Sequence, residues 1–287
     1  VRTTPLETLL YLGQAYRLNY KFQESLDAFN ELISRLDPQT TEDGTLLADA
    51  EREIDITKNA IYHIDNPVDA TLENLGATIN TKYTEHSPII DLNEEMLIFT
   101  SRRPRENEAA INSDEDIFVS RKVNNEWQNP VRLSSPINTE IHNEAAIALS
   151  TDGKQLFFFR SGYNNAGNVY ITERLDEQGY QWSQPKLIRE DMNTKYRETH
   201  VCLSPDGHSL FFTSNRKGGE GQRDIYVMRK LPDGEWSAPK NIGKSINTPY
   251  NEESPYIHPD GVTMFFSSEG HNAMGGYDVF QTTMDKQ

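Results

Sequence analysis

The sequence repeats one phrase four times over most of its length. Each copy opens on an Asn-Thr pair, and consecutive pairs are 58, 55 and 54 residues apart. The four pairs are Asn80-Thr81, Asn138-Thr139, Asn193-Thr194 and Asn247-Thr248. A repeat of this length is one supersecondary unit that buries its apolar side against its neighbours, so it must be recognised before any fold is assigned.

Four further columns recur in the same order, three of them in every copy and the last in the first three copies. A turn column comes first: Leu92-Asn93-Glu94, Thr151-Asp152-Gly153, Pro205-Asp206-Gly207 and Pro259-Asp260-Gly261. Two strand columns follow, which begin at Leu97, Leu156, Leu210 and Met264, and at Asp116, Asn168, Asp224 and Asp278. The tryptophans of the chain form the last column: Trp127, Trp182 and Trp236. The repeat therefore predicts a four-stranded unit with a tight turn between its first two strands.

The third copy carries the fullest form of the phrase. Ser-Pro-Asp-Gly at residues 204–207 is followed by Leu-Phe-Phe, Ser-Asn-Arg and then Asp-Ile-Tyr, which ends at residue 226. This phrase resembles the WD40-like repeat of TolB-type β-propellers, and the resemblance covers about residues 68–284. It implies a mainly β fold, a propeller of four-stranded antiparallel blades with four repeats visible. Because six blades are usual in that group, a six-bladed parent stays open beside a four-bladed ring.

The segments that lead into two of the Asn-Thr pairs carry a second resemblance. Asn74-Leu-Gly and Asn241-Ile-Gly begin segments similar to those of periplasmic Bacteroidetes proteins. In those proteins a tetratricopeptide segment precedes the propeller, an OmpA-like peptidoglycan-binding domain often follows, and some members serve type IX secretion and gliding. The resemblance implies a non-enzymatic scaffold in a periplasmic, outer-membrane-associated assembly, with protein partners that are basic or associated with the outer membrane.

Residues 1–66 are predicted to form a small all-α segment, and residues 67–287 the propeller. Apolar residues recur at three and four positions through two helices, the second of which ends at Pro38, and a third helix is expected from Thr45 to Ile64. The order of residues 9–32 is similar to the tetratricopeptide pattern, from which Ser25 and Leu32 depart. Such a hairpin buries its apolar faces only by stacking, so it is expected to dock on the propeller, continue a solenoid or bind a partner helix.

Residues 68–75 align with the fourth strands of the repeats. Asn74 and Asn241 both stand six residues before the Asn of an Asn-Thr pair, while the last copy has no fourth strand of its own. A propeller ring closes when a strand from one end of the chain completes the blade begun at the other. We therefore expect residues 68–75 to close a ring of four blades, with a longer propeller as the alternative.

The acidic composition limits the classes of partner. A net charge of −16, from 44 acidic and 28 basic side chains, excludes the basic surface that nucleic acids require. Anionic membrane surfaces are disfavoured for the same reason, and no apolar run is long enough to span a bilayer. The chain begins at Val1 without an apolar signal region, so we expect a mature protein or a fragment. With Cys202 as its single cysteine, the chain is expected to hold a buried thiol and no intrachain disulfide.

No catalytic, cofactor-binding or metal-binding motif occurs in the sequence. No two of the 7 histidines are three to five residues apart, and the sequence has no Gly-x-Ser-x-Gly elbow, phosphate-binding loop or EF-hand spacing. We therefore expect a protein that is not an enzyme and uses no cofactor. Glycosidases also use propellers, and acids are abundant here, so a glycan-binding or glycan-processing propeller is the alternative.

A glutamate at the start of each first strand gives the one candidate site: Glu85, Glu144, Glu198 and Glu252. First strands line the central channel of a propeller, so these carboxylates are expected to gather at one mouth. There they would repel one another, raise some pKa values, or bind a cation or a basic side chain. The alternative is that each carboxylate accepts hydrogen bonds from its own nearby backbone.

Two further columns have expected structural roles. Arg103 and Arg216 end the second strand, and we expect them to pair within a blade with Asp116 and Asp224. The tryptophan column is expected to pack between blades.

Overall fold

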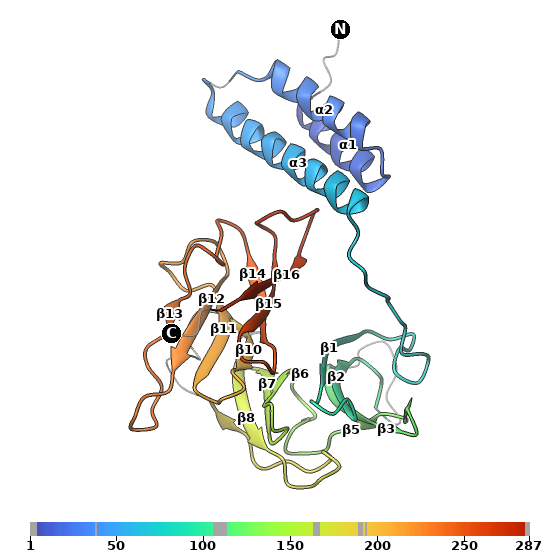
Figure 1. The fold of residues 1–287 in the computed structure, drawn as a ribbon, viewed down its shortest axis with the longest axis vertical. Coiled ribbons are helices and arrows are strands. Elements are labelled where there is room, and N and C mark those ends of the chain that lie inside the picture. The colour runs from blue at the N-terminus through green and yellow to red at the C-terminus, as the bar shows by residue number, and fades with distance from the viewer. Residues whose placement is uncertain are drawn as a thin grey trace. The chain divides into compact units, whose positions relative to one another are not determined.

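The computed structural model describes residues 5–37, 39–105, 114–162, 167–188, 192 and 194–284 (Figure 1). The helices are α1 (Glu7–Leu18), α2 (Phe22–Arg35) and α3 (Thr41–Asp65). The strands are β1 (Glu85–Ile90), β2 (Met96–Ser101), β3 (Asp116–Val123), β4 (Glu126–Trp127), β5 (Val131–Arg132), β6 (Glu144–Leu149), β7 (Gln155–Ser161), β8 (Gly167–Glu173), β9 (Lys186–Leu187), β10 (Glu198–Leu203), β11 (Ser209–Ser214), β12 (Asp224–Arg229), β13 (Lys240–Asn241), β14 (Glu252–Ile257), β15 (Thr263–Ser268) and β16 (Asp278–Thr283).

The chain divides into two compact units. The helical unit comprises Val1–Thr71 together with Ser268–Asp278, and the blade unit comprises Leu72–Ser267 together with Val279–Gln287. None of the helices in the described ranges is long and apolar enough to cross a membrane.

In the helical unit, α1 and α2 approach closely at Gly13. A Cβ atom at Gly13 would lie 2.3 Å from the Phe29 ring, so only glycine permits this approach. The buried Ser25 hydroxyl donates to the Gly13 carbonyl at 2.8 Å. The third helix begins at Thr41 rather than at the predicted Thr45, because the Thr40 side chain accepts a hydrogen bond from Asp43 N–H at 3.2 Å and caps the helix. Pro38, the predicted end of the second helix, lies outside the described residues.

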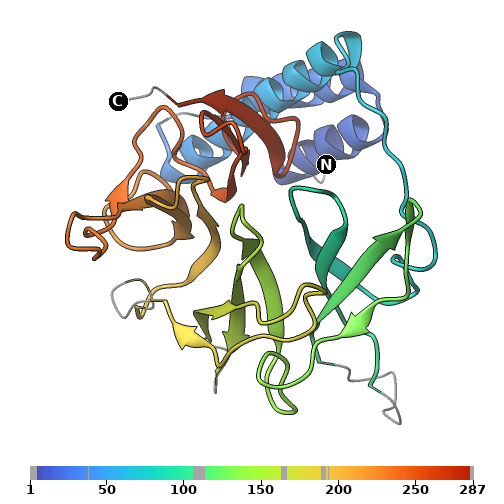
Figure 2. The ribbon, with the colours of Figure 1, turned by 60° about the horizontal axis from the view of Figure 1, so that its bottom comes forward.

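The described part of the blade unit consists of four antiparallel sheets in chain order, which confirms the predicted mainly β propeller fold (Figure 2). Blade 1 contains β1–β5, blade 2 contains β6–β9, blade 3 contains β10–β13 and blade 4 contains β14–β16. In blade 1, β5 pairs with β3 beside β4. The first strands β1, β6, β10 and β14 pack against one another in that order.

Apolar cores lie between consecutive blades. Each core combines a third-strand side chain of one blade with a second-strand side chain of the next: Ile117 with Phe158, Val169 with Phe212, and Ile225 with Phe266. Trp182 belongs to the core between blades 1 and 2, and Trp236 packs against the core between blades 2 and 3, as predicted. Trp127 packs instead on the outer face of blade 1, beside Ile79.

The prediction that residues 68–75 close the ring is wrong for this structure. These residues form no strand, and Leu72 is 99 % exposed. Within the described residues, the last sheet contains β14, β15 and β16 and no fourth strand. The fourth strands that do form, β5, β9 and β13, are 2 residues long each. Pairing alone therefore supplies too few hydrogen bonds to offset the entropy of fixing a segment.

Candidate functional site

Each glutamate of the candidate column is the first residue of its blade's first strand. Each accepts two hydrogen bonds from the threonine of its own Asn-Thr pair, one from the backbone N–H and one from the hydroxyl. The distances are 3.2 and 2.9 Å from Thr139 to Glu144, and 2.8 and 2.5 Å from Thr248 to Glu252. The same bonds join Thr81 to Glu85 and Thr194 to Glu198. The threonine column therefore fixes where each first strand starts.

In three blades an arginine from the end of the second strand also binds this glutamate. The pairs are Arg103 with Glu85 at 3.2 Å, Arg160 with Glu144 at 2.8 Å and Arg216 with Glu198 at 3.2 Å. Each guanidinium lies 5.0–5.5 Å from the centroids of two rings of its own blade: Phe99 and Phe118, Phe158 and Tyr170, or Phe212 and Tyr226. The arginine thus joins an ion pair to a cation–π contact inside one blade.

The predicted pairs, Arg103 with Asp116 and Arg216 with Asp224, are wrong. Asp224 accepts instead the backbone N–H of Glu220 at 3.0 Å, and Asp116 binds Arg132 at 2.6 Å. The strand register explains the difference. In blade 3, Ser214 stands opposite Glu198 on one side and opposite Asp224 on the other, so the arginine just beyond Ser214 has a choice of two carboxylates. It takes the one on the first strand.

The pKa values of these carboxyl groups are set inside single blades. Burial raises the pKa of Glu144, against the opposing effect of its bonds from Thr139 and Arg160. Burial also acts on Glu85, but the hydrogen bonds from Thr81 and Arg103 outweigh it and lower the Glu85 pKa. Both shifts follow from burial and local donors.

The structure therefore places the four glutamates at equivalent positions and gives each a local set of donors. Among the described residues, no three His, Cys, Asp or Glu side chains are grouped so that they could hold a metal ion. The wall of the central cavity begins two residues further along β1, β6, β10 and β14. In three blades the basic side chain bound to the glutamate is an arginine of the same blade. Binding of a cation at a shared mouth by Glu85, Glu144, Glu198 and Glu252 stays a prediction.

A cavity of about 680 Å³ lies between the first strands of the four blades. Three of its lining residues, Ser87, His200 and Ser254, have φ values of 51°, 50° and 54°. This left-handed region costs a non-glycine residue about 1–3 kcal/mol. Register shifts at the same places in β1 and β10 mark β-bulges, which redirect the side chains of a strand. Each bulge stands two residues after a glutamate of the column, so the fixed strand start also positions the cavity wall.

His200 gives the cavity wall a titratable group. Its Nδ1 lies 2.9 Å from the Thr199 hydroxyl. Burial, with the positive charges of Arg223 and Arg197, lowers the His200 pKa to about 4. The imidazole is therefore neutral at physiological pH and can donate or accept a hydrogen bond. The neighbouring Cys202 thiol accepts the Ile257 N–H at 3.3 Å, and burial raises its pKa to about 11.

The bulge residues were not predicted from the sequence, because they have no catalytic or metal-binding spacing. One signal was present. Pro88 and Pro255 directly follow Ser87 and Ser254, and a proline inside a strand lacks the N–H that a ladder needs, so it favours a bulge. Nothing comparable follows His200.

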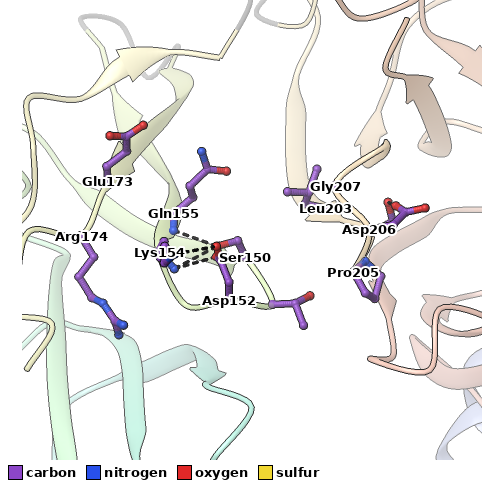
Figure 3. Close-up of a pocket in the computed structure, with 12 residues that line it drawn as sticks. Ser150, Asp152, Lys154, Gln155, Glu173, Arg174, Leu203, Pro205, Asp206 and Gly207 are labelled. Carbon is purple, nitrogen blue, oxygen red and sulfur yellow. Dashed lines mark hydrogen bonds and ion pairs between the residues drawn. The ribbon is translucent and has the colours of Figure 1, made fainter. Parts of the chain in front are cut away.

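A second cavity, of about 500 Å³, lies at the turns of blades 2 and 3 (Figure 3). The Ser150 hydroxyl donates to Asp152 at 2.6 Å and accepts the Gln155 N–H at 2.9 Å. Across the cavity, Asp206 is bound in the same way by Ser204. The Ser bonds lower the pKa of both aspartates. The Asp of the turn column thus stabilises its own turn, which accounts for its recurrence in the repeats.

Comparisons with known proteins show the following likenesses. No protein-family model matches the sequence, and no curated protein matches it. Among solved structures, the chain is similar to TolB from Acinetobacter baumannii, with 17% identity and a TM-score of 0.48 over 72% of this chain and 42% of that one. It is similar to an α-L-arabinofuranosidase from Lactobacillus brevis, with 10% identity and a TM-score of 0.46 over 69% and 72%. It is also similar to a periplasmic gluconolactonase from Pseudomonas aeruginosa, with 14% identity and a TM-score of 0.39 over 70% and 57%.

The chain spans less than half the length of the TolB structure. Proteins with different activities share this likeness, so it assigns no activity to the chain.

Proposed function

We propose that this chain is a non-enzymatic protein-interaction scaffold whose helical unit binds extended polypeptide. One observation carries the proposal. Within the helical unit, side chains of α1 and α3 hold residues 268–278 through the main-chain carbonyl groups of that segment.

Three of these side chains carry amide or guanidinium donors, and His63 Nε2 of α3 also lies 3.3 Å from the Asn272 carbonyl. Arg17 of α1 donates to the Met274 carbonyl at 3.0 Å. Asn59 and Arg52 of α3 donate to the carbonyls of Ala273 at 3.2 Å and Glu269 at 3.3 Å. Donors that contact carbonyl groups bind the backbone, which every polypeptide shares. A surface of this kind can therefore accept segments of different sequence.

One of the donors, Arg17, is also held by side chains of the helices themselves. Arg17 forms an ion pair with Glu53 at 2.9 Å, and both side chains are mostly buried. Gln14 donates to the same carboxylate at 2.7 Å. Ala273 is buried in this contact, so a small side chain suits that position of a bound segment. A donor held in this way, such as Arg17, loses little freedom on binding, which favours affinity.

We further propose that the scaffold works in a periplasmic, outer-membrane-associated assembly such as a secretion or gliding machine. The resemblance of the segments at Asn74 and Asn241 to periplasmic proteins supports this compartment. The net charge of −16 supports partners with basic surfaces. Neither feature identifies the partner.

A peptide-binding experiment tests the scaffold. Replacing residues 269–275 by a Gly-Ser loop in the full chain frees the helical surface, and a synthetic peptide of residues 268–278 should then bind in calorimetry. Adding Arg52→Ala and Asn59→Ala removes two hydrogen bonds and should weaken binding by about tenfold or more. Lys58→Ala, an exposed residue of the same helix, is the matched control and should leave the affinity unchanged.

The alternative is a glycan-binding or glycan-processing propeller. One feature of the central cavity favours glycan binding: neutral His200 and the half-exposed Tyr256 in its wall suit a sugar ring. Screening the parent chain against oligosaccharides separates the two functions. Turnover of any oligosaccharide, or absence of peptide binding by the freed helical surface, would contradict the scaffold.

A further inference from the structure

Arg174 contributes a charged side chain to the second cavity, at the turns of blades 2 and 3, and its surroundings hold it in place. Its backbone N–H donates to the Lys154 carbonyl at 2.8 Å, and a β-bridge joins it to Trp182. The guanidinium lies over Gly153, where a Cβ atom would be 3.5 Å from Nη1. Within the described residues, however, this guanidinium forms no hydrogen bond or ion pair. Its N–H donors are therefore available to a ligand.

The repeat does not account for this arginine. Lys122 and Lys230 occupy the same position in blades 1 and 3, since each makes the same backbone bond to the residue before the second strand. The Lys122 ammonium lies 5.4 Å from the centroid of the Trp127 ring, in a cation–π contact. Trp182 of blade 2 is instead buried in the core between blades 1 and 2. A cation–π contact of the kind seen in blade 1 therefore does not explain Arg174.

Asp206 lies on the other wall of the cavity, which blade 3 supplies (Figure 3). The Ser204 hydroxyl and the His208 N–H, the latter at 2.9 Å, both donate to its Oδ1 atom. The bond from Ser204, followed by the one from His208, lowers the pKa of Asp206, so the carboxylate is ionised at neutral pH. No other residue in the described part of the chain donates to Oδ2, which can accept a bond from a ligand.

The cavity has the size and the charge balance of a site for a ligand with two opposite charges. Its volume of about 500 Å³ falls within the range of small-molecule sites. Three acidic and two basic side chains line it: Asp152, Glu173, Asp206, Lys154 and Arg174. The carboxylates would repel a simple anion, and the two basic groups would repel a simple cation. A ligand with a carboxylate at one end and an ammonium group at the other meets neither difficulty.

On the blade 2 wall, Arg174 is the charge that stays available. Lys154 Nζ lies 4.0 Å from Asp152 Oδ2, so these two charges offset each other. Glu173 and Arg174 are consecutive residues, and their side chains point in opposite directions (Figure 3). Arg174 and Asp206 are therefore the opposite charges that the two walls of the cavity offer to a ligand.

We propose that this cavity binds the two charged ends of a free amino acid or a short peptide. The carboxylate of the ligand pairs with the Arg174 guanidinium, whose planar fork matches a carboxylate. The ammonium group of the ligand donates to Oδ2 of Asp206, and its side chains lie against Leu203 and Pro205 on the blade 3 wall. All of these residues belong to the blade unit, so the site is separate from the surface proposed for the helical unit.

Calorimetric titration of the full chain with alanine, dialanine and trialanine tests the site and distinguishes the amino acid from the peptides. Two charge-assisted contacts support a dissociation constant of about 1 mM or tighter for the ligand whose charged ends span the cavity. Acetylating the amino group of that ligand, or amidating its carboxylate, removes one charge and should raise the dissociation constant about tenfold or more. Absence of binding by all three ligands would overturn the proposal, and so would equal binding of the blocked forms.

Two variants assign the charges of the ligand to the two walls. Arg174→Met keeps the apolar stem of the side chain, so it should weaken binding about tenfold and make the amidated and unblocked ligands bind alike. Asp206→Asn keeps an oxygen acceptor for its turn and should remove the preference for an unblocked amino group. Lys230→Met is the matched control, because Lys230 is the corresponding residue of blade 3, is exposed and is not among the residues that line the cavity.

The control should bind the ligand as the parent does, and thermal unfolding of each variant shows whether it is folded. Unchanged affinity in folded Arg174→Met would overturn the proposal. None of these measurements involves the helical surface, so failure here leaves the scaffold proposal standing, and failure of the scaffold leaves this site standing.

Discussion

The guanidinium of Arg216 binds Glu198 across blade 3, with Nη2 at 3.2 Å from Oε1, while Asp224 on the neighbouring strand is bound by backbone N–H groups. The arginine also covers the rings of Phe212 and Tyr226. One side chain thus joins the first, second and third strands of a blade. This role explains why arginine recurs at the end of the second strand.

The corresponding pair in blade 2 should be the most sensitive to mutation, because Glu144 is fully buried. Arg160→Leu leaves that carboxylate without its guanidinium, and losing one partner of a buried pair costs about 3–5 kcal/mol. Urea unfolding at neutral pH should show a loss of this order. Lys154→Ala, which removes an exposed lysine of the same blade, should change stability by less than about 0.5 kcal/mol.

The loss of stability caused by Arg160→Leu should also depend on pH. Burial raises the folded-state pKa of Glu144, and removal of the guanidinium should raise it further. A raised carboxyl pKa means that the folded state binds the proton more tightly, so stability is greatest at low pH and falls as pH rises through the folded pKa. The variant should therefore approach the parent as the pH is lowered. An equal deficit at acid and neutral pH would show that lost packing, and not the uncompensated charge, is responsible.

The blades were predictable because each column of the repeat has a local cause. Asp206 stabilises its turn, and Phe212 fills an interblade core. The partner of Arg216 was not predictable, because Ser214 stands opposite both Glu198 and Asp224, and strand register is a property of the folded sheet. The predicted boundary at residue 66 directly follows the end of α3. That residues 268–278 belong to the helical unit could not be predicted, because the periodicity of the sequence says nothing about which distant segment packs on the helices.

The candidate site was predictable in position but not in surroundings. The spacing of Glu198 and Glu252 from their Asn-Thr pairs placed them at the starts of first strands, as found. The threonine bonds that occupy these carboxylates depend on how the chain turns before the strand. The cavity wall at His200 depends on a β-bulge, which changes the face of the strand on which the following side chains lie. The hydrophobic pattern alone does not show where such a bulge occurs.

His200 should make the protein sensitive to mild acid. Its folded-state pKa of about 4 lies below the ordinary value of 6.5, so the unfolded chain takes up the proton first. The free energy of unfolding should therefore fall as pH drops from about 6.5 to about 4, by up to about 3 kcal/mol from this group. His200→Asn keeps a residue type that tolerates positive φ and should flatten this part of the stability curve. His208→Asn changes an exposed histidine of the same blade and should follow the parent curve.

Gly13 and Gly44 should respond in opposite ways to alanine. A Cβ at Gly13 meets the Phe29 ring at 2.3 Å, whereas nothing lies within 4 Å of one at Gly44 in α3. Gly13→Ala should destabilise the helical unit by about 1–3 kcal/mol through overpacking, and Gly44→Ala should stabilise it by up to about 1 kcal/mol through helix propensity. Hydrogen exchange of the helical amides in the full chain measures both changes. Unchanged exchange in Gly13→Ala would contradict the close packing of α1 on α2, and faster exchange in Gly44→Ala would contradict the open space beside that position in α3.

Asn247 and Asn80 occupy the same column of the repeat but should differ in importance. Asn247 bonds both backbone groups of Ile225 in a buried interface, so Asn247→Ala leaves a buried N–H and carbonyl without those partners. Each such group costs about 1–3 kcal/mol, and a combined loss of about 2–4 kcal/mol in urea unfolding is expected. Asn80→Ala removes a side chain that is exposed and bonded to Asn74, so it should cost less than about 1 kcal/mol. Equal losses for the two variants would mean that the column acts through the local fold of its own segment and not through the preceding blade.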